Sequence, residues 1–210
     1  MGRKVRYKPV SVRELLTELQ STTMLMIDLA YSAILFNDME LAEEVGELEE
    51  KVDDLKTLLL MNTAIAVRNA QDAEAMIGIM RMGTVADRIS NAAGDIARTI
   101  LLGIGVDPFV VEALSKTQER LVKSKVLKES ILVGKTLGKL RFETNIGVNI
   151  IAVRRGKGLI TQPRQNMTLK EEDILIARGS DVGILELDKL AKGELRSVPR
   201  PKMDVKEKHP

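Results

Sequence analysis

The stretch Val148-Asn149-Ile150-Ile151-Ala152-Val153 is a short β-branched run, and similar bursts occur at Ile131-Leu132-Val133 and Ile174-Leu175-Ile176. All three lie after residue 126. Before that point, apolar residues recur three and four positions apart in long amphipathic runs, which is the period of helices. After it the period is that of strands. The sequence therefore predicts two unlike modules that meet near residue 126.

The first module is predicted to be an antiparallel four-helix bundle over residues 11–125. Its helices are expected at residues 11–36, 40–69, 72–103 and 107–126. Ser11 followed by Glu14 forms a capping box at the first helix, and Asp107-Pro108 provides an N-cap and a first-turn proline for the last. Long helices with short connections favour a bundle of neighbouring antiparallel helices.

The second module, residues 126–192, is predicted to be a small α/β domain with the order β-α-β-β-β-α, which makes the whole chain α+β. Strands are expected at 130–133, 148–154, 159–161 and 174–178, with helices at 137–144 and 181–192. Residues 193–210 hold three of the six prolines and many charges. We expect this tail to be disordered.

Composition excludes several kinds of catalytic site. There is no cysteine, and the single histidine, His209, lies in the predicted tail. Histidine-dependent triads and thiolate or imidazole metal sites are therefore not expected. Gly134-Lys135-Thr136 is similar to the end of a phosphate-binding loop, but Glu129 stands where that loop needs its first glycine. We expect a protein that is not an enzyme.

The location of the protein follows from its apolar segments. The strongest of them, from Met24 to Phe36, is shorter than the roughly 20 residues of a membrane span and contains Asp28. The first residues lack the apolar stretch of a signal peptide. We therefore expect a cytoplasmic protein that lies at a membrane only through a partner.

Positive charge is concentrated in one part of the chain. Residues 120–170 contain twelve Lys and Arg residues against Glu129 and Glu143 alone. Such a surface suits phosphate or another anion, although ordinary solvated charge explains it equally well. Because aromatic residues make up only 2% of the chain, few side chains could stack on nucleic acid bases. No nucleic acid is therefore expected as a partner.

The second module resembles the TrkA-C domain, the ligand-binding part of regulators of potassium conductance. The resemblance rests on four motifs: Ser130-Ile-Leu-Val-Gly-Lys-Thr-Leu137, Val148-Asn-Ile-Ile-Ala-Val-Arg-Arg-Gly156, Gln162-Pro163 and Leu169-Lys-Glu-Glu-Asp-Ile-Leu-Ile-Ala-Arg-Gly-Ser180. It implies a homodimeric module that binds a small effector at the subunit junction and biases a membrane transporter or channel.

The same resemblance implies an effector pocket beside the second strand, with cyclic di-AMP as one ligand class. Carried over by position, its residues are Ile150, Ile151, Arg154, Arg155 and Pro163. Two arginines beside an apolar strand could pair a cyclic phosphate while a base packs on aliphatic side chains. The alternative is that both arginines are outward charges at the end of a strand.

The helical module resembles the PhoU domain more loosely. The phrase Asp87-Arg88-Ile89-Ser90-Asn91 followed by Asp95 is similar to the metal-binding stripe of that family. Glu49 with Asp53, or Glu50 with Asp54, are its possible counterparts on the preceding helix. The resemblance implies a divalent metal site; the predicted set is Glu50, Asp54, Asp87, Asn91 and Asp95. Four-residue spacing stacks carboxylates on one helix face, but a solvated acidic face has the same spacing.

These features predict a cytoplasmic, homodimeric regulator of cation transport, and the TrkA-C resemblance implies that the cation is potassium. Its partner would be a membrane transporter or channel, and effector binding would change the pose of its two subunits. The alternative is a metal-binding, PhoU-like regulator of phosphate transport or phosphate signalling.

Overall fold

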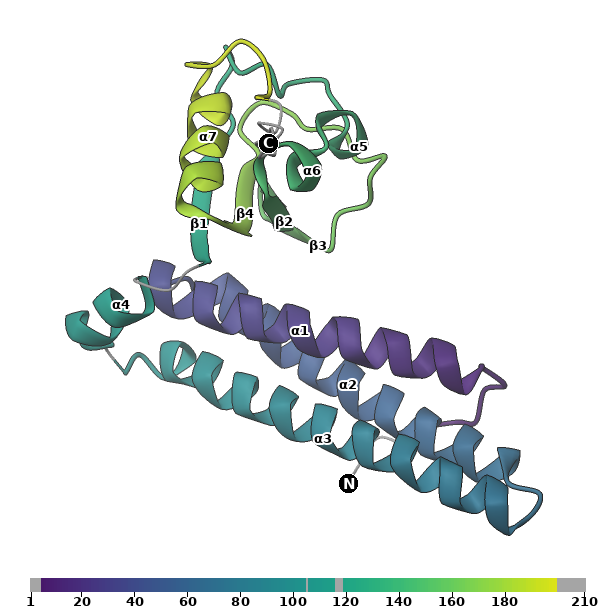
Figure 1. Cartoon of the computed structure of the whole chain (residues 1–210). Coiled ribbons are helices and arrows are strands. Elements are labelled where there is room, and N and C mark those ends of the chain that lie inside the picture. The colour runs from purple at the N-terminus through teal and green to yellow at the C-terminus, as the bar shows by residue number, and fades with distance from the viewer. Residues whose placement is uncertain (1–4, 105, 116–118, 200–210) are drawn as a thin grey trace, which may run out of the picture. The chain divides into compact units, whose positions relative to one another are not determined.

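The computed structural model describes residues 5–104, 106–115 and 119–199, and within them the chain divides into two compact units. The first ends at Val111 and the second begins at Glu112. Figure 1 shows that the first unit is helical and that the second contains a sheet covered by helices. The expected α+β class is confirmed, and each unit is described by itself below.

Three long helices form the first unit: α1 (Val12–Phe36), α2 (Met39–Ala66) and α3 (Ala70–Leu101). Each begins at a polar N-cap whose side chain accepts a hydrogen bond from a backbone N–H of the first turn. Ser11 caps α1, Asp38 caps α2 and Asn69 caps α3. All three helices pack against one another, and the alternation of direction makes α1 and α3 run the same way (Figure 1).

The core of the helical unit follows the apolar repeat of α2. Leu41, Val45, Leu48, Val52, Leu55 and Leu59 are all buried. Helix α1 contributes ten buried residues, so it is enclosed on much of its surface. Within the described residues α1 is also the one helix that passes a test of length and apolar composition for a membrane span, but 56% of its most apolar window is buried inside the fold. Bundle packing accounts for its apolar composition.

The prediction of a fourth long helix over 107–126 is wrong. The structure has a short helix, α4 (Pro108–Ser115), and then the strand β1 (Arg120–Lys125). The strand has the alternation of a half-buried element, since Val122 is partly buried, Lys123 is exposed and Ser124 is buried. Pairing with β4, whose partner residues lie 49 to 59 positions further along the chain, fixes β1 as a strand. The six residues of β1 taken alone do not reveal this pairing. The sheet unit therefore begins before residue 126, and the bundle has three long helices.

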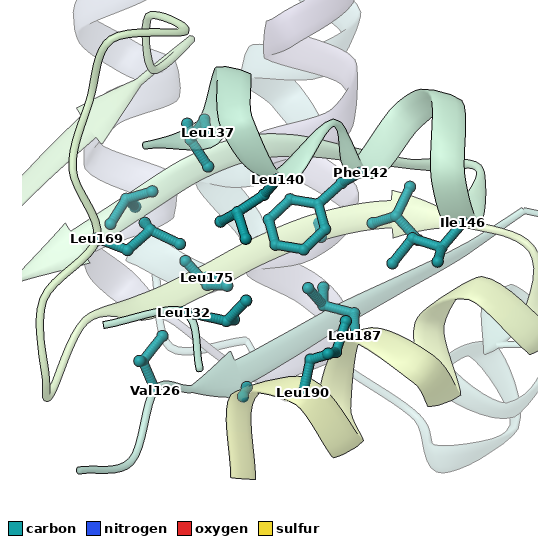
Figure 2. Packing of buried hydrophobic residues seen from close by; sticks show 14 residues of the cluster. Val126, Leu132, Leu137, Leu140, Phe142, Ile146, Leu169, Leu175, Leu187 and Leu190 are labelled. Carbon is teal, nitrogen blue, oxygen red and sulfur yellow. The ribbon is translucent and has the colours of Figure 1, made fainter. Parts of the chain in front are cut away.

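The second unit is built on an antiparallel sheet with the strand order β1-β4-β2-β3. Its other elements are α5 (Leu137–Leu140), α6 (Phe142–Ile146), β2 (Val148–Arg155), β3 (Gly158–Thr161), β4 (Ile174–Gly179) and α7 (Asp181–Lys192). One hydrophobic cluster joins the three helices to one face of the sheet (Figure 2). Phe142 of α6, Leu187 of α7 and Leu175 of β4 belong to it.

Two predicted features of this unit need correction. Residues 130–133 form turns and not a strand, because the Ser130 hydroxyl donates to the Leu190 carbonyl oxygen and also accepts from the Leu132 N–H. The predicted disordered tail is ordered in its first part: Gly193 ends α7 with φ +79°, and Leu195 and Val198 pack against the core. Residues 200–210 lie outside the described part of the chain.

Gly183 controls how closely α7 can approach the sheet. A β-carbon at this position would overlap the Ile146 carbonyl oxygen and come within 2.9 Å of Val148 Cγ2. We predict that Gly183→Ala destabilises the sheet unit by about 2 kcal/mol, because α7 must move outward from its core. Urea unfolding followed by circular dichroism measures this change.

The matched control is Gly46→Ala in α2, where a β-carbon meets no atom within 4 Å. It should stabilise the protein by about 0.5–1 kcal/mol through helix propensity alone. Equal effects of the two substitutions would contradict the close packing of α7.

Candidate effector site and carboxylate cluster

A β-bulge lies in the middle of β2, where the effector pocket was predicted. Ile150 pairs with Ala177 and Ala152 with Ile176, so Ile151 is the additional residue. Gln162, in the left-handed region at φ +45°, donates its N–H to the Ile151 carbonyl oxygen at 3.0 Å. Bulges and left-handed non-glycine residues are both enriched at functional sites. The bond connects the bulge to the residue immediately before Pro163.

The two predicted isoleucines have different surroundings. Ile150 is partly buried and packs against the hydrophobic cluster under the helices. Ile151 is only 3% exposed, yet it does not belong to that cluster. Pro163 is partly buried in the segment that follows β3. The structure thus brings Ile151 and the Gln162-Pro163 turn together, while Ile150 contributes to the core.

Arg155 is engaged in an ion pair. Its Nε and Nη2 atoms donate to the two carboxylate oxygens of Asp173 at 2.7 Å each, and Nη2 also donates to the Thr168 carbonyl oxygen at 2.8 Å. The Asp173 side chain is only 1% exposed. Hydrogen bonding to this carboxylate raises the pKa of Arg155, although partial burial opposes the effect. Arg155 therefore supports the fold and is not available as an effector ligand in this arrangement.

Arg154 belongs to the opposite face of the sheet, because successive residues of a strand alternate. It pairs in register with Leu159 on β3 and with Ile174 on β4, and it is partly buried. Ala152 and Ile176, a pair two positions along the strand, share this face. Arg154 therefore shares its face of the sheet with apolar side chains, which is the arrangement that the predicted pocket requires of an arginine. The alternation of side chains along a strand could have predicted from the sequence that Arg154 and Arg155 lie on opposite faces.

The acids of α3 meet Glu49 and Asp53, one of the two possible pairs on α2, and not Glu50 and Asp54 of the predicted set. Asp53 of α2 interacts with Asp87 of α3, and Glu49 lies near Asp87 and Asp95. Cations accompany them: Lys56 Nζ is 2.7 Å from Asp87 Oδ2, and Arg98 Nη2 is 3.0 Å from Asp95 Oδ1. Arg98 Nη2 also lies 3.4 Å from Glu49 Oε1.

The predicted metal set is divided between two surfaces. Glu50 and Asp54 line an acidic groove with Glu43, Glu47 and Lys51, whereas Glu49 and Asp53 are the residues that face α3. The buried apolar positions of α2 could have indicated which of its acids lie beside α3, because Glu49 stands four residues after buried Val45 and three before buried Val52. Asn91 is exposed. Among the described residues, no three His, Cys, Asp or Glu side chains are arranged to hold a metal ion.

Burial and mutual repulsion perturb two of these carboxyl groups. Partial burial is the largest cause that raises the pKa of Glu49, and Arg98 opposes it. For Asp53, partial burial again comes first, followed by the hydrogen bond to Asp87, and together they raise its pKa. The cluster therefore binds protons more readily than separate carboxyl groups would.

Comparison with known proteins agrees with both units. The TrkA-C domain profile matches residues 121–192 and the PhoU domain profile matches residues 16–100. Ktr system potassium uptake protein C of Bacillus subtilis (strain 168) is 34% identical over 104 residues, which cover 50% of this chain and 46% of that protein. The chain thus spans about half the length of this curated relative.

Two solved structures are partly similar to this chain. The RCK C domain of the potassium transport protein KtrA, in complex with cyclic diadenosine monophosphate, is 30% identical, covers 39% of this chain and 91% of its own, and has a TM-score of 0.33. S. agalactiae BusR in complex with its busAB promoter DNA is 15% identical, covers 82% of this chain and 96% of its own, and also has a TM-score of 0.33.

The fold and these matches define a class of protein in which a helical PhoU domain precedes a small TrkA-C sheet domain. The chain is a two-domain PhoU-like and TrkA-C protein.

Loss of the Arg155 side chain should weaken the sheet unit. We predict that Arg155→Ala lowers its free energy of unfolding by about 3 kcal/mol, because the buried Asp173 carboxylate loses its cation. Arg155→Lys should have a smaller effect, since it keeps the charge and loses the paired geometry. Urea unfolding provides the measurement, and Lys157→Ala in the exposed β2–β3 turn is the control. Equal midpoints for the two alanine variants would show that the ion pair contributes nothing.

The carboxylate cluster predicts an unusual pH dependence. Because Glu49 and Asp53 have raised pKa values, the folded chain binds more protons than the unfolded chain above their ordinary values of 4.5 and 3.8. Their contribution to stability therefore decreases as pH rises through the raised values. Asp53→Asn should stabilise the helical unit at pH 7 and reduce this decrease.

Urea unfolding midpoints measured between pH 4.5 and pH 7.5, in steps of about one pH unit, test this prediction. Glu47→Gln, which removes the same charge from an exposed position on the same helix, is the matched control. If both variants change the pH profile alike, net charge and not the contact with Asp87 would be responsible.

Proposed function

We propose that this protein is a cytoplasmic, homodimeric regulatory subunit of potassium transport that senses a small effector through its TrkA-C domain. The observation that carries the proposal is the TrkA-C match over residues 121–192. The similarity to a Ktr potassium uptake protein supports potassium as the transported ion. On this reading the protein acts by binding and not by catalysis.

Cyclic di-AMP is the effector class that we propose. The KtrA RCK C domain, which was solved with this ligand, is 30% identical to the matched part of the chain. In our proposal, Arg154 pairs a phosphate of the effector, while Pro163 contacts a base and the buried Ile151 supports the strand beneath it. Arg155 holds the end of β2 through Asp173 and positions Arg154 beside it. This division of roles follows from the opposite directions of the two adjacent side chains.

Signalling to the transporter requires that the effector bind one arrangement of the two subunits better than another. An effector at a dimer junction meets this requirement, because its affinity depends on how the two copies approach each other. The helical units would then transmit the new arrangement to the membrane partner.

A second candidate function is metal binding by the PhoU-like unit, in a regulator of phosphate transport. The contact of Asp53 with Asp87 favours it, since two carboxyl groups held together attract a cation. Lys56 and Arg98 already supply positive charge at that surface. For this reason we rank this function second.

A thermal-shift titration tests the proposed effector. Cyclic di-AMP should raise the melting temperature of the wild-type chain, because a ligand that binds only the folded state stabilises it. Arg154→Ala should reduce the shift to less than about a third of the wild-type value, as expected for a lost charge-assisted pair. Calorimetric titration provides the affinity.

Lys157→Ala is the matched control, because it removes a nearby exposed cation from the β2–β3 turn. It should leave the shift unchanged. Cyclic di-AMP that stabilises wild type and Arg154→Ala equally would contradict the pocket assignment. A shift with Mn²⁺ that disappears in Asp87→Ala, together with no response to cyclic di-AMP, would favour the metal-binding candidate instead.

A further inference from the structure

Strand β3 (Gly158–Thr161) forms one edge of the antiparallel sheet, and β1 forms the other. The two edges differ in charge. Three of the six residues of β1 are cations, Arg120, Lys123 and Lys125, and such charges keep an edge from pairing with another strand. Strand β3 contains no charged residue and no proline. An open, uncharged edge of this kind is a template for a further strand.

Two residues of β3 direct their backbone groups away from β2. The Gln162 N–H donates to the Ile151 carbonyl oxygen of β2. Because a trans peptide points its C=O opposite to its N–H, the Thr161 C=O points outward. Backbone groups of successive strand residues alternate in direction, so Leu159 also faces outward, whereas Ile160 faces β2. Within the described part of the chain, no hydrogen bond from another segment reaches these outward groups.

The outward groups lie symmetrically on either side of Ile160. Leu159 and Thr161 each offer one N–H and one C=O, so two antiparallel copies of β3 can exchange four hydrogen bonds. Ile160 then meets its own counterpart as a non-hydrogen-bonded pair, the arrangement in which opposite side chains lie closest. Its side chain is 38% exposed although it pairs with buried Val153. The counterpart would therefore cover apolar surface that a single chain leaves open.

The geometry points to an antiparallel pairing of β3 with β3 of a second copy of this chain, across a two-fold axis at Ile160. The inference rests on the proposed function, in which two copies meet at the effector site, and it names the edge at which they meet. Backbone groups alone would accept any strand. A second copy fits this edge in particular, because outward residues that flank one apolar residue make the strand its own complement.

The position of the effector site agrees with this junction. Pro163, which the proposed function places against the effector, follows β3 by two positions. Because it has no N–H, it also ends the possible ladder on that side. A junction at β3 therefore brings the effector sites of both copies close to one axis.

Cysteine cross-linking tests the axis, because the chain contains no cysteine. Ile160→Cys should form a disulfide between two copies under mild oxidation, since the Cα atoms of a non-hydrogen-bonded pair are about 4.5 Å apart, within the range of a disulfide. Val133→Cys is the matched control, because Val133 has the same exposed fraction of 38% but lies in a turn. We expect Ile160→Cys to cross-link about tenfold faster than Val133→Cys.

Proline substitution tests the outward backbone groups. Thr161→Pro removes an outward N–H, and an edge strand accepts proline where its N–H faces solvent. Two of the four hydrogen bonds between the copies are then lost, so the dissociation constant of the dimer should rise by about tenfold or more. Thr161→Val, which keeps the N–H and the β-branched shape, should leave this constant unchanged. Sedimentation equilibrium measures both constants, and circular dichroism checks that both variants fold.

Sedimentation of the wild-type chain separates this inference from the proposed function. A chain that stays monomeric at micromolar concentration, with and without cyclic di-AMP, would contradict the homodimer and the edge pairing together. A dimer that Thr161→Pro does not weaken, and in which the two cysteine variants cross-link at equal rates, would overturn the edge pairing alone. If Thr161→Pro does not fold, the ratio of the two cross-linking rates decides by itself.

Discussion

The buried ion pair between Asp173 and Arg155 is the interaction on which the sheet unit depends. Asp173 accepts two hydrogen bonds from Arg155 at the end of β2 and a third from the Lys170 N–H. Its own carbonyl oxygen accepts from the Val126 N–H, just after β1, at 2.8 Å. One residue therefore connects the end of β2, the turn before β4 and the exit from β1. An unpaired carboxylate in this position would be costly, so the pair also selects one register for the sheet.

This pair explains why the two adjacent arginines cannot have the same role. A strand directs Arg154 and Arg155 to opposite faces, and the buried acid holds only the second of them. The bulge at Ile151 adds a further asymmetry, because it puts one extra residue in β2 next to the Gln162-Pro163 turn. Interactions of the neighbouring residues thus hold the proposed effector site in one conformation, which precise recognition of a ligand requires.

Much of the fold could be predicted from the sequence where local signals agree with tertiary packing. The six-residue seam of α2, the capping residue Ser11 and the helix from Asp181 to Lys192 are strong periodic or capping signals, and the structure contains them all. Prediction was wrong where long-range pairing decides. Arg120–Lys125 becomes a strand only because β4 lies beside it, and Ser130 becomes a turn residue because α7 presents the Leu190 carbonyl oxygen. The predicted site shows the same division: strand alternation could have put Arg154 and Arg155 on opposite faces, but only the position of Asp173 shows which of the two is held in an ion pair.

The helical unit carries two surfaces that a free-standing bundle would not need. On one, Glu49 and Asp53 are placed where neighbouring acids and partial burial raise their pKa values, a cost to stability at neutral pH. On the other, apolar side chains between α1 and α3 remain exposed although the same helices bury a continuous core. Three helices leave such a groove because a fourth long helix does not follow α3; the chain instead enters α4 and then a strand. The early change from helix to strand therefore shapes both units: it supplies β1 to the sheet, and it leaves the apolar groove between α1 and α3 without a fourth long helix in the described part of the chain.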